Sequence, residues 1–383
     1  MITHFKKLDW ILIAAIVLLC TYGLIMVYSA GMLLGYERHG DYAYFFNRQK
    51  DWLIIGIPVF IFAIITNYRI YDKLTPIFVG GIILGLLLVL IPFIGVEVNG
   101  SRRWLEFGFR IQPSEIAKLV MIIYFARVYA RKQPYIHQFK QGIMPPLAVL
   151  VFIFFLILLQ PDLGTGTSIL VACGAILICS GAKWKHIIVL ATIAAVSVGF
   201  LATSASYRME RLTSFIDPFG NESDTGFQLV NSFIAIGDAG IFGRGLGQGI
   251  HKLGYLPEAH TDFILAVISE ELGIFGILFL FLLYLIILIR GVRIGVAIKE
   301  PFGKLLALGI TFQISSQVFF NAGAVSGVLP ITGITLPFIS YGGSSLLITI
   351  FAAGVLVHLS KHATIAREAR EETESTWGQK ITS

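Results

Sequence analysis

The chain alternates between long apolar runs and short polar segments. Ten runs approach the roughly 20 residues that a helix needs to cross a bilayer. They cover residues 10–30, 52–67, 75–94, 113–130, 145–160, 165–182, 186–204, 263–289, 304–325 and 342–359. Continuous runs indicate helices, whereas an outer-membrane barrel would show alternating strands of about ten residues. The pattern therefore predicts an all-α polytopic membrane protein with about ten transmembrane helices.

The composition agrees with a lipid environment. Of the 383 residues, 56% are hydrophobic and 14% are charged, whereas a soluble domain carries about 25% charged residues. The net charge of +6 does not indicate nucleic-acid binding, because Lys and Arg are concentrated in short loops between the apolar runs. Cys20, Cys173 and Cys179 all lie within apolar runs and are expected to be small buried side chains, neither disulfides nor metal ligands.

The distribution of Lys and Arg predicts the orientation. Inner loops of membrane proteins carry more of these residues than outer loops, and the richer set includes both ends of the chain. Both termini should therefore be cytoplasmic. Residues 1–362 are predicted to form the membrane domain, with an uncleaved first span and a long extracellular loop, 205–262, between helices 7 and 8. Residues 363–383 form a charged cytoplasmic tail.

A polar cluster lies at the outer mouth of the eighth span. Glu258, His260, Thr261 and Asp262 precede the apolar run directly. We predict that Asp262 is the working group, although Thr261–Asp262 could instead only cap the helix. No HExxH spacing accompanies the cluster, so a zinc site is not expected.

Two further carboxylates, Glu270 and Glu271, fall inside the same run, where a charge is costly without a partner or a function. Glu270 should lie about 12 Å deeper than Asp262, within about 80° of its direction, so both could edge one cavity. Glu271 points the opposite way and is expected to pair with another helix.

Two motifs place cations near this outer face. Arg102 and Arg103 stand beside an indole in Gly100-Ser-Arg-Arg-Trp104, which fits either a phosphate clamp or an interfacial anchor. Glu115 and Lys118 are three residues apart at the start of the fourth span and can pair on one helix face. Lys118 lies about one turn into the lipid region, which favours a cavity-facing role over a purely structural pair.

Three glycine- or proline-containing segments complete the outer surface. Residues 330–345 contain two prolines and a Gly pair, and this predicts broken backbone against a cavity that includes Ser344. Residues 160–164 form a short turn in which Asp162 either caps the next helix or joins the site. Residues 243–249 are rich in Gly but follow no strand, so we do not expect a nucleotide-binding loop. We expect these glycines to form turns.

These motifs together resemble the SEDS family (shape, elongation, division and sporulation). The resemblance covers nearly the whole chain and is carried by residues 100–104, 112–115, 160–164, 256–263, 270–273 and 336–345. It is strongest to the division branch, with the elongation and sporulation branches as alternatives. It implies a peptidoglycan glycosyltransferase that polymerises lipid II at the outer leaflet of the bacterial cell membrane, at the division septum.

The resemblance also implies roles for residues and partners. The essential family Asp maps onto Asp262, which we expect to be ionised at neutral pH and to act as general base in an inverting transfer. The cavity residues map onto Glu115 and Lys118, and a divalent cation, Mg or Mn, could share the pyrophosphate charge with the arginines. The implied partners are a class B penicillin-binding transpeptidase and other divisome membrane proteins. Two other functions stay open from sequence, namely a lipid II flippase and a non-enzymatic scaffold for the transpeptidase.

Overall fold

The computed structural model describes residues 7–98, 100–106, 108–220 and 224–382. Each of the ten predicted runs coincides with a helix. These helices are α2 (Trp10–His39), α3 (Tyr44–Ile65), α4 (Tyr68–Leu90), α5 (Pro113–Arg131), α6 (Met144–Leu158), α7 (Leu163–Cys179), α8 (Trp184–Thr203), α11 (Ile264–Ala297), α12 (Pro301–Val325) and α13 (Gly343–Thr382). By length and composition, seven helical stretches of the described chain could cross a membrane.

Short polar residues define where several helices begin. The side chains of Asp9, Asn67, Asp162 and Glu300 accept hydrogen bonds from backbone N–H groups in the first turns of α2, α4, α7 and α12, which satisfies donors that have no partner within the helix. α3 begins eight residues before the predicted run. Residues 47–51 of this helix are polar or charged, so hydropathy assigned its first two turns to a loop.

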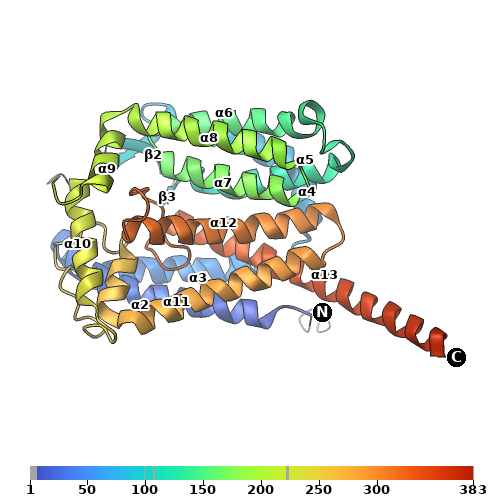
Figure 1. The fold of residues 1–383 in the computed structure, drawn as a ribbon. Coiled ribbons are helices and arrows are strands. Elements are labelled where there is room, and N and C mark those ends of the chain that lie inside the picture. The colour runs from blue at the N-terminus through green and yellow to red at the C-terminus, as the bar shows by residue number, and fades with distance from the viewer. Residues whose placement is uncertain (1–6, 99, 107, 221–223, 383) are drawn as a thin grey trace.

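The bundle has a buried centre and an exposed edge. α12 and α13 are the most buried of the membrane-length helices, whereas none of the most apolar 18-residue stretch of α8 is buried. α12 packs against α5, α7 and α11, and α13 packs against α3. The start of α2 and the last described turn of α13 lie at the same end of the bundle (Figure 1), as the prediction of two cytoplasmic termini requires.

The opposite end carries the additional structure (Figure 1). A three-stranded antiparallel sheet, which the all-α prediction did not include, is formed by β1 (Gly95–Val98), β2 (Ser101–Glu106) and β3 (Arg110–Ile111). The long loop contains two helices, α9 (Ser206–Ile216) and α10 (Asp224–Asp238). Beyond residue 362, the predicted tail continues α13 without a break as far as Thr382, and residue 383 lies outside the described residues. The remaining helical turns are η1 (Gln133–Tyr135) and η2 (Phe139–Ile143).

Candidate functional site

Asp262 lies in a tight turn immediately before α11. The Glu258 carbonyl accepts hydrogen bonds from the backbone N–H groups of Thr261 and Phe263 at 3.1 and 3.3 Å. The side-chain amide of Asn321, on α12, donates to the Asp262 carbonyl at 2.8 Å and to the Ile334 carbonyl at 2.8 Å. The backbone of Asp262 is therefore held between α12 and the segment that precedes α13.

The carboxylate of Asp262 is not a helix cap. α11 begins at Ile264, its N-cap residue is Phe263, and no side chain caps it. None of the described residues donates a hydrogen bond to the Asp262 carboxylate. This excludes the helix-capping alternative for Asp262 and leaves its carboxylate without a hydrogen-bond donor among the described residues.

The surroundings of Asp262 raise its pKa to about 7, because the carboxylate is largely removed from water and faces the negative charges of Glu258 and Asp162. Arg211 and Arg103 oppose this effect. The side chain nevertheless keeps partial solvent access. The expectation of full ionisation at neutral pH is therefore corrected, since the group titrates near pH 7, where a general base is most effective.

Arg211, on α9, is the site residue that the sequence did not reveal. A Cβ placed on Gly333 would lie 3.4 Å from Asp262 Oδ2 and 3.9 Å from Arg211 Nη1, so both side chains reach the same space next to this glycine. The Arg211 guanidinium donates one hydrogen bond of 3.4 Å, to the Ile331 carbonyl. No carboxylate of the described residues lies within ion-pair distance of it. Lys and Arg are usually less frequent in outer loops than in inner loops, so an arginine in the outer loop was the sequence signal that could have identified Arg211.

Strand β2 separates the two predicted clamp residues. Successive side chains of a strand point to opposite faces, and Arg102 pairs with Glu97 at 3.1 Å in the exposed hairpin. Arg103 donates to the carbonyls of Gln160 and Pro161, at 3.0 and 2.5 Å, in the turn before α7. The structure thus directs Arg103 toward the Asp262 side and does not combine the two guanidinium groups in one clamp.

Asp162 is mainly structural. Its Oδ1 accepts from the backbone N–H of Thr165 at 3.1 Å, which caps α7. Its Oδ2 accepts from Gln112 and Ser114, at the start of α5, at 3.2 and 3.3 Å. Of the two alternatives from the sequence, the residue therefore adopts the capping role, and it affects Asp262 through its charge.

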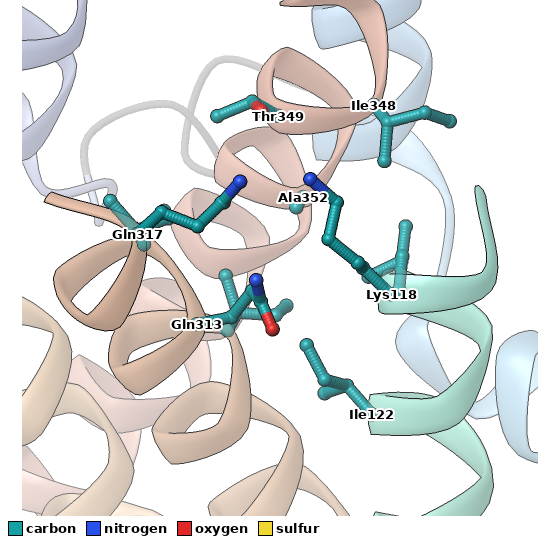
Figure 2. Close-up of a pocket in the computed structure, with 10 residues that line it drawn as sticks. Lys118, Ile122, Gln313, Gln317, Ile348, Thr349 and Ala352 are labelled. Atoms are coloured by element: carbon teal, nitrogen blue, oxygen red, sulfur yellow. The ribbon is translucent and has the colours of Figure 1, made fainter. Parts of the chain in front are cut away.

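The predicted Glu115–Lys118 pair forms within α5, with Nζ and Oε2 2.7 Å apart and both side chains buried. Figure 2 shows Lys118 directed into a small cavity between α5, α12 and α13, opposite Gln317 and Thr349. The cavity volume of about 20 Å³ accommodates about one water molecule. Lys118 therefore lines this cavity, and its role toward substrate stays a prediction.

A polar stripe on α12 connects this cavity to Asp262. Gln313, Gln317 and Asn321 recur every four residues, which places them on one face of the helix. All three are buried, and the side-chain oxygens of Gln313 and Asn321 have no hydrogen-bond partner among the described residues. The four-residue spacing within an apolar run was a signal in the sequence that could have identified these residues.

The remaining predicted site residues make structural contacts. His260 is buried between Phe45 and Tyr341, with ring centroids 4.3 and 5.6 Å away, and burial lowers its pKa. Glu258 is exposed and accepts a hydrogen bond of 2.7 Å from the Thr261 hydroxyl. Ser344 donates to the Arg110 carbonyl at 3.0 Å, which connects α13 to β3.

Glu270 and Glu271 do not line the Asp262 site, so the prediction that Glu270 could edge one cavity with Asp262 is wrong. Both side chains are fully buried, with 0% exposure. Glu270 accepts hydrogen bonds from the 243–252 loop, and Glu271 contacts Ser29 of α2. The prediction that Glu271 pairs with another helix is therefore confirmed.

Metal ligands are not assembled in the part of the chain that the structure describes, since no group of three His, Cys, Asp or Glu side chains could hold an ion. A divalent cation coordinated mainly by substrate phosphates would need only one or two protein carboxylates. Asp262 is the available carboxylate that faces the site, so a cation would depend on the substrate for its other ligands.

The family model and the similar curated proteins point to the same family. The model of the FtsW/RodA/SpoVE family, described as "Cell cycle protein", matches residues 9–365. A "Probable peptidoglycan glycosyltransferase FtsW" from Bacillus subtilis is 43% identical, over 93% of this chain and 91% of its own length. The "Stage V sporulation protein E" of the same organism is 41% identical, over 93% of this chain and 97% of its own length.

A solved structure shares the fold. It is described as "Structural coordination of polymerization and crosslinking by a peptidoglycan synthase complex". The alignment has a TM-score of 0.74 and 26% sequence identity and covers 92% of this chain and 97% of the other. The arrangement of helices around the Asp262 turn therefore occurs within a known architecture.

Proposed function

The chain belongs to the FtsW/RodA/SpoVE family, and we propose that it polymerises lipid II into β-1,4-linked glycan strands at the outer leaflet, with Asp262 as general base. The enzyme is a peptidoglycan glycosyltransferase of cell-wall synthesis and a multi-pass membrane protein. The observation that carries the proposal is the Asp262 carboxylate. It receives no hydrogen bond from the described residues, has a pKa of about 7 and shares the space next to Gly333 with Arg211.

The proposed reaction is an inverting displacement. The 4-hydroxyl of the acceptor sugar forms a bond to the anomeric carbon of the donor while Asp262 accepts the hydroxyl proton. The bond from the anomeric carbon to the phosphate oxygen breaks, and undecaprenyl pyrophosphate leaves with the electron pair. The α-linked phosphate becomes a β-glycoside. Arg211 and Arg103, whose charges both act on Asp262, stabilise the negative charge on the leaving group, and Mg²⁺ or Mn²⁺ would neutralise part of the same charge when bound.

Septal function and partners are further parts of the proposal. The division branch is supported by the FtsW relatives, but the sporulation relative is nearly as similar, at 41% against 43% identity. A class B penicillin-binding transpeptidase is the proposed partner, because a structure with the same fold is described as a complex of polymerisation and crosslinking. Other divisome proteins would join at the septum.

A polymerisation assay separates the polymerase from the flippase and the scaffold. Purified protein with labelled lipid II and Mg²⁺ should produce glycan strands in detergent, where transport between leaflets cannot be measured. A scaffold should produce strands only when an active polymerase is added. Absence of strands with and without the transpeptidase would contradict the proposed function, and strands only with the transpeptidase would show that the partner activates the enzyme.

Gly333→Ala is expected to lower polymerisation roughly 10- to 100-fold, since a misplacement of about 1 Å near the reacting groups has effects of this size. The new methyl group would lie 3.4 Å from Asp262 Oδ2 and 3.9 Å from Arg211 Nη1, at a residue with φ of +71°. Gly100→Ala is the matched control, because Gly100 has the same φ of +71° and no atom within 4 Å of the added Cβ. Equal activity in the two variants would show that this space is not used by substrate.

A further inference from the structure

α11 is divided into two helical segments at Gly273. This residue has φ of +62° and ψ of −157°, which is not a helical conformation. A Cβ there would lie 2.4 Å from the backbone nitrogen of Gly243 and 2.5 Å from the carbonyl oxygen of Ile241. Residues 264–272 therefore form a short helix of their own, and Asp262 lies two residues before it. A helix of nine residues does not fix its own orientation and depends on packing.

The 241–245 segment supports this break. Where the helix is interrupted, backbone groups lose their helical partners and need others. The Glu270 and Glu271 carbonyls accept from the backbone N–H groups of Arg244 and Gly245 at 2.8 and 2.9 Å, and Ile274 N–H donates to the Ile241 carbonyl at 3.1 Å. The glycine-rich motif that resembles a nucleotide loop thus serves to bind the broken helix.

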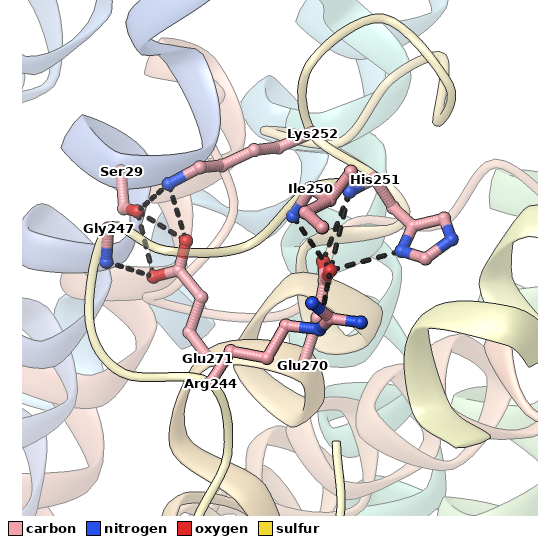
Figure 3. A network of polar contacts seen from close by, with 8 residues as sticks. All are labelled: Ser29, Arg244, Gly247, Ile250, His251, Lys252, Glu270 and Glu271. Atoms are coloured by element: carbon pink, nitrogen blue, oxygen red, sulfur yellow. Dashed lines mark hydrogen bonds and ion pairs between the residues drawn. The ribbon is translucent and has the colours of Figure 1, made fainter. Parts of the chain in front are cut away.

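Two buried carboxylates make different connections at this break (Figure 3). Glu270 is satisfied within the loop, by Ile250 N–H at 2.7 Å and His251 Nδ1 at 3.0 Å. Glu271 instead reaches α2, where its oxygens lie 2.7 and 2.8 Å from the Ser29 hydroxyl. Lys252 Nζ lies 2.6 Å from Glu271 and 2.7 Å from Ser29. We call Ser29, Lys252 and Glu271 the Glu271 triad.

The other end of the short helix is anchored separately. Asn321 binds the Asp262 carbonyl at 2.8 Å, and the Ser340 hydroxyl donates to the Thr261 carbonyl at 2.7 Å. At 1.5 Å per residue, about 13 Å separates the Asp262 turn from the triad along the helix. If the helix tilts by about 5° around the triad, Asp262 moves by ~1 Å. Such a displacement is enough to affect a reaction that depends on proton transfer.

We propose that the Glu271 triad positions Asp262, by connecting the short helix 264–272 to α2 and to the 241–252 loop. This inference rests on the proposed function, because it assumes that Asp262 is the base. A buried ion pair rarely stabilises a protein more than well-packed apolar side chains would. The contacts among Ser29, Lys252 and Glu271 instead fix the orientation of the short helix more narrowly than apolar packing would. The triad acts through Asp262 and does not itself contact substrate.

The test compares Lys252→Met with Glu271→Gln, singly and together, in the full-length purified protein. Each single variant leaves one buried polar or charged group without its partner and should lower the melting temperature. The double variant removes both charges and should recover most of the melting temperature. Its kcat for lipid II polymerisation should stay roughly 10- to 100-fold below the unmodified protein, with KM changed by less than about threefold. Lys7→Met with Glu368→Gln, an exposed pair at the opposite end, is the matched control.

Ser29→Ala keeps the test decisive if the double variant does not fold. It removes the contact to α2 while Lys252 and Glu271 stay paired, so the protein should fold normally. We expect kcat to fall several-fold and hydrogen exchange of amides 264–272 to accelerate. Unchanged kcat in Ser29→Ala, or in a folded double variant, would overturn the inference.

Asp262→Asn in the same assay distinguishes the two proposals. If this variant loses activity and the triad variants keep theirs, only the positioning role fails. If it polymerises normally, the base assignment fails, and the exchange rates still report whether the triad holds the short helix.

Discussion

Asp262→Asn should lower the rate of lipid II polymerisation roughly 10²- to 10⁴-fold, which is the usual contribution of a general base. The amide preserves the size of the side chain but cannot accept the hydroxyl proton. The measurement is the initial rate of glycan-strand formation from labelled lipid II by purified protein. A rate within about tenfold of the unmodified enzyme would refute the assignment of Asp262 as base.

The melting temperature of Asp262→Asn shows whether the variant folds, because the substitution is expected not to lower it at pH 8. Because the pKa of Asp262 is raised to about 7 in the folded protein, the folded state binds the proton more tightly than the unfolded chain does. Stability contributed by the protonated group is therefore lost as the pH rises through 7. Asp262→Asn removes this titration, so at pH 8 the variant should melt no lower than the unmodified protein. Glu106→Gln, at an exposed outer-face pair, is a suitable activity control.

Arg211→Gln should reduce kcat by roughly 10²-fold, as the loss of one group that stabilises charge in a transition state commonly does. The same substitution should change the dependence of kcat on pH.

Activity of the unmodified enzyme should rise through about pH 7 as Asp262 loses its proton. Arg211 lowers the pKa of Asp262, so its removal should shift this rise to higher pH. The measurement is kcat against pH for both proteins.

Arg102→Gln is the comparison that separates Arg211 from the predicted arginine clamp. Arg102 is exposed and pairs with Glu97, and exposed pairs contribute little to stability. We expect this variant to keep most of its activity and the pH profile of the unmodified enzyme. If Arg102→Gln lost activity and Arg211→Gln did not, the leaving-group role would return to the β2 arginine.

The sequence determined the features that depend on neighbours along the chain. Apolar runs set the positions of ten helices, because burying an unpaired backbone in lipid leaves few alternatives to a helix. The three-residue spacing of Glu115 and Lys118 placed both on one helix face, where they pair at 2.7 Å. A cluster of polar groups at the mouth of an apolar run led us to propose Asp262 as the working group.

Only the tertiary structure decided which distant residues complete the site. Residues 101–106 form strand β2, which hydropathy did not predict, and successive side chains of a strand point to opposite faces, so Arg102 and Arg103 are separated. Arg211 and Gly333 face Asp262 because α9 folds back over the segment before α13. Glu271 meets Ser29, 242 residues away in sequence. Local spacing fixes contacts within an element, whereas contacts between elements depend on how the whole bundle packs. Asp262 could therefore be proposed from the sequence alone, but its burial, the contribution of Arg211 to its pKa and the contacts that hold it in place could not.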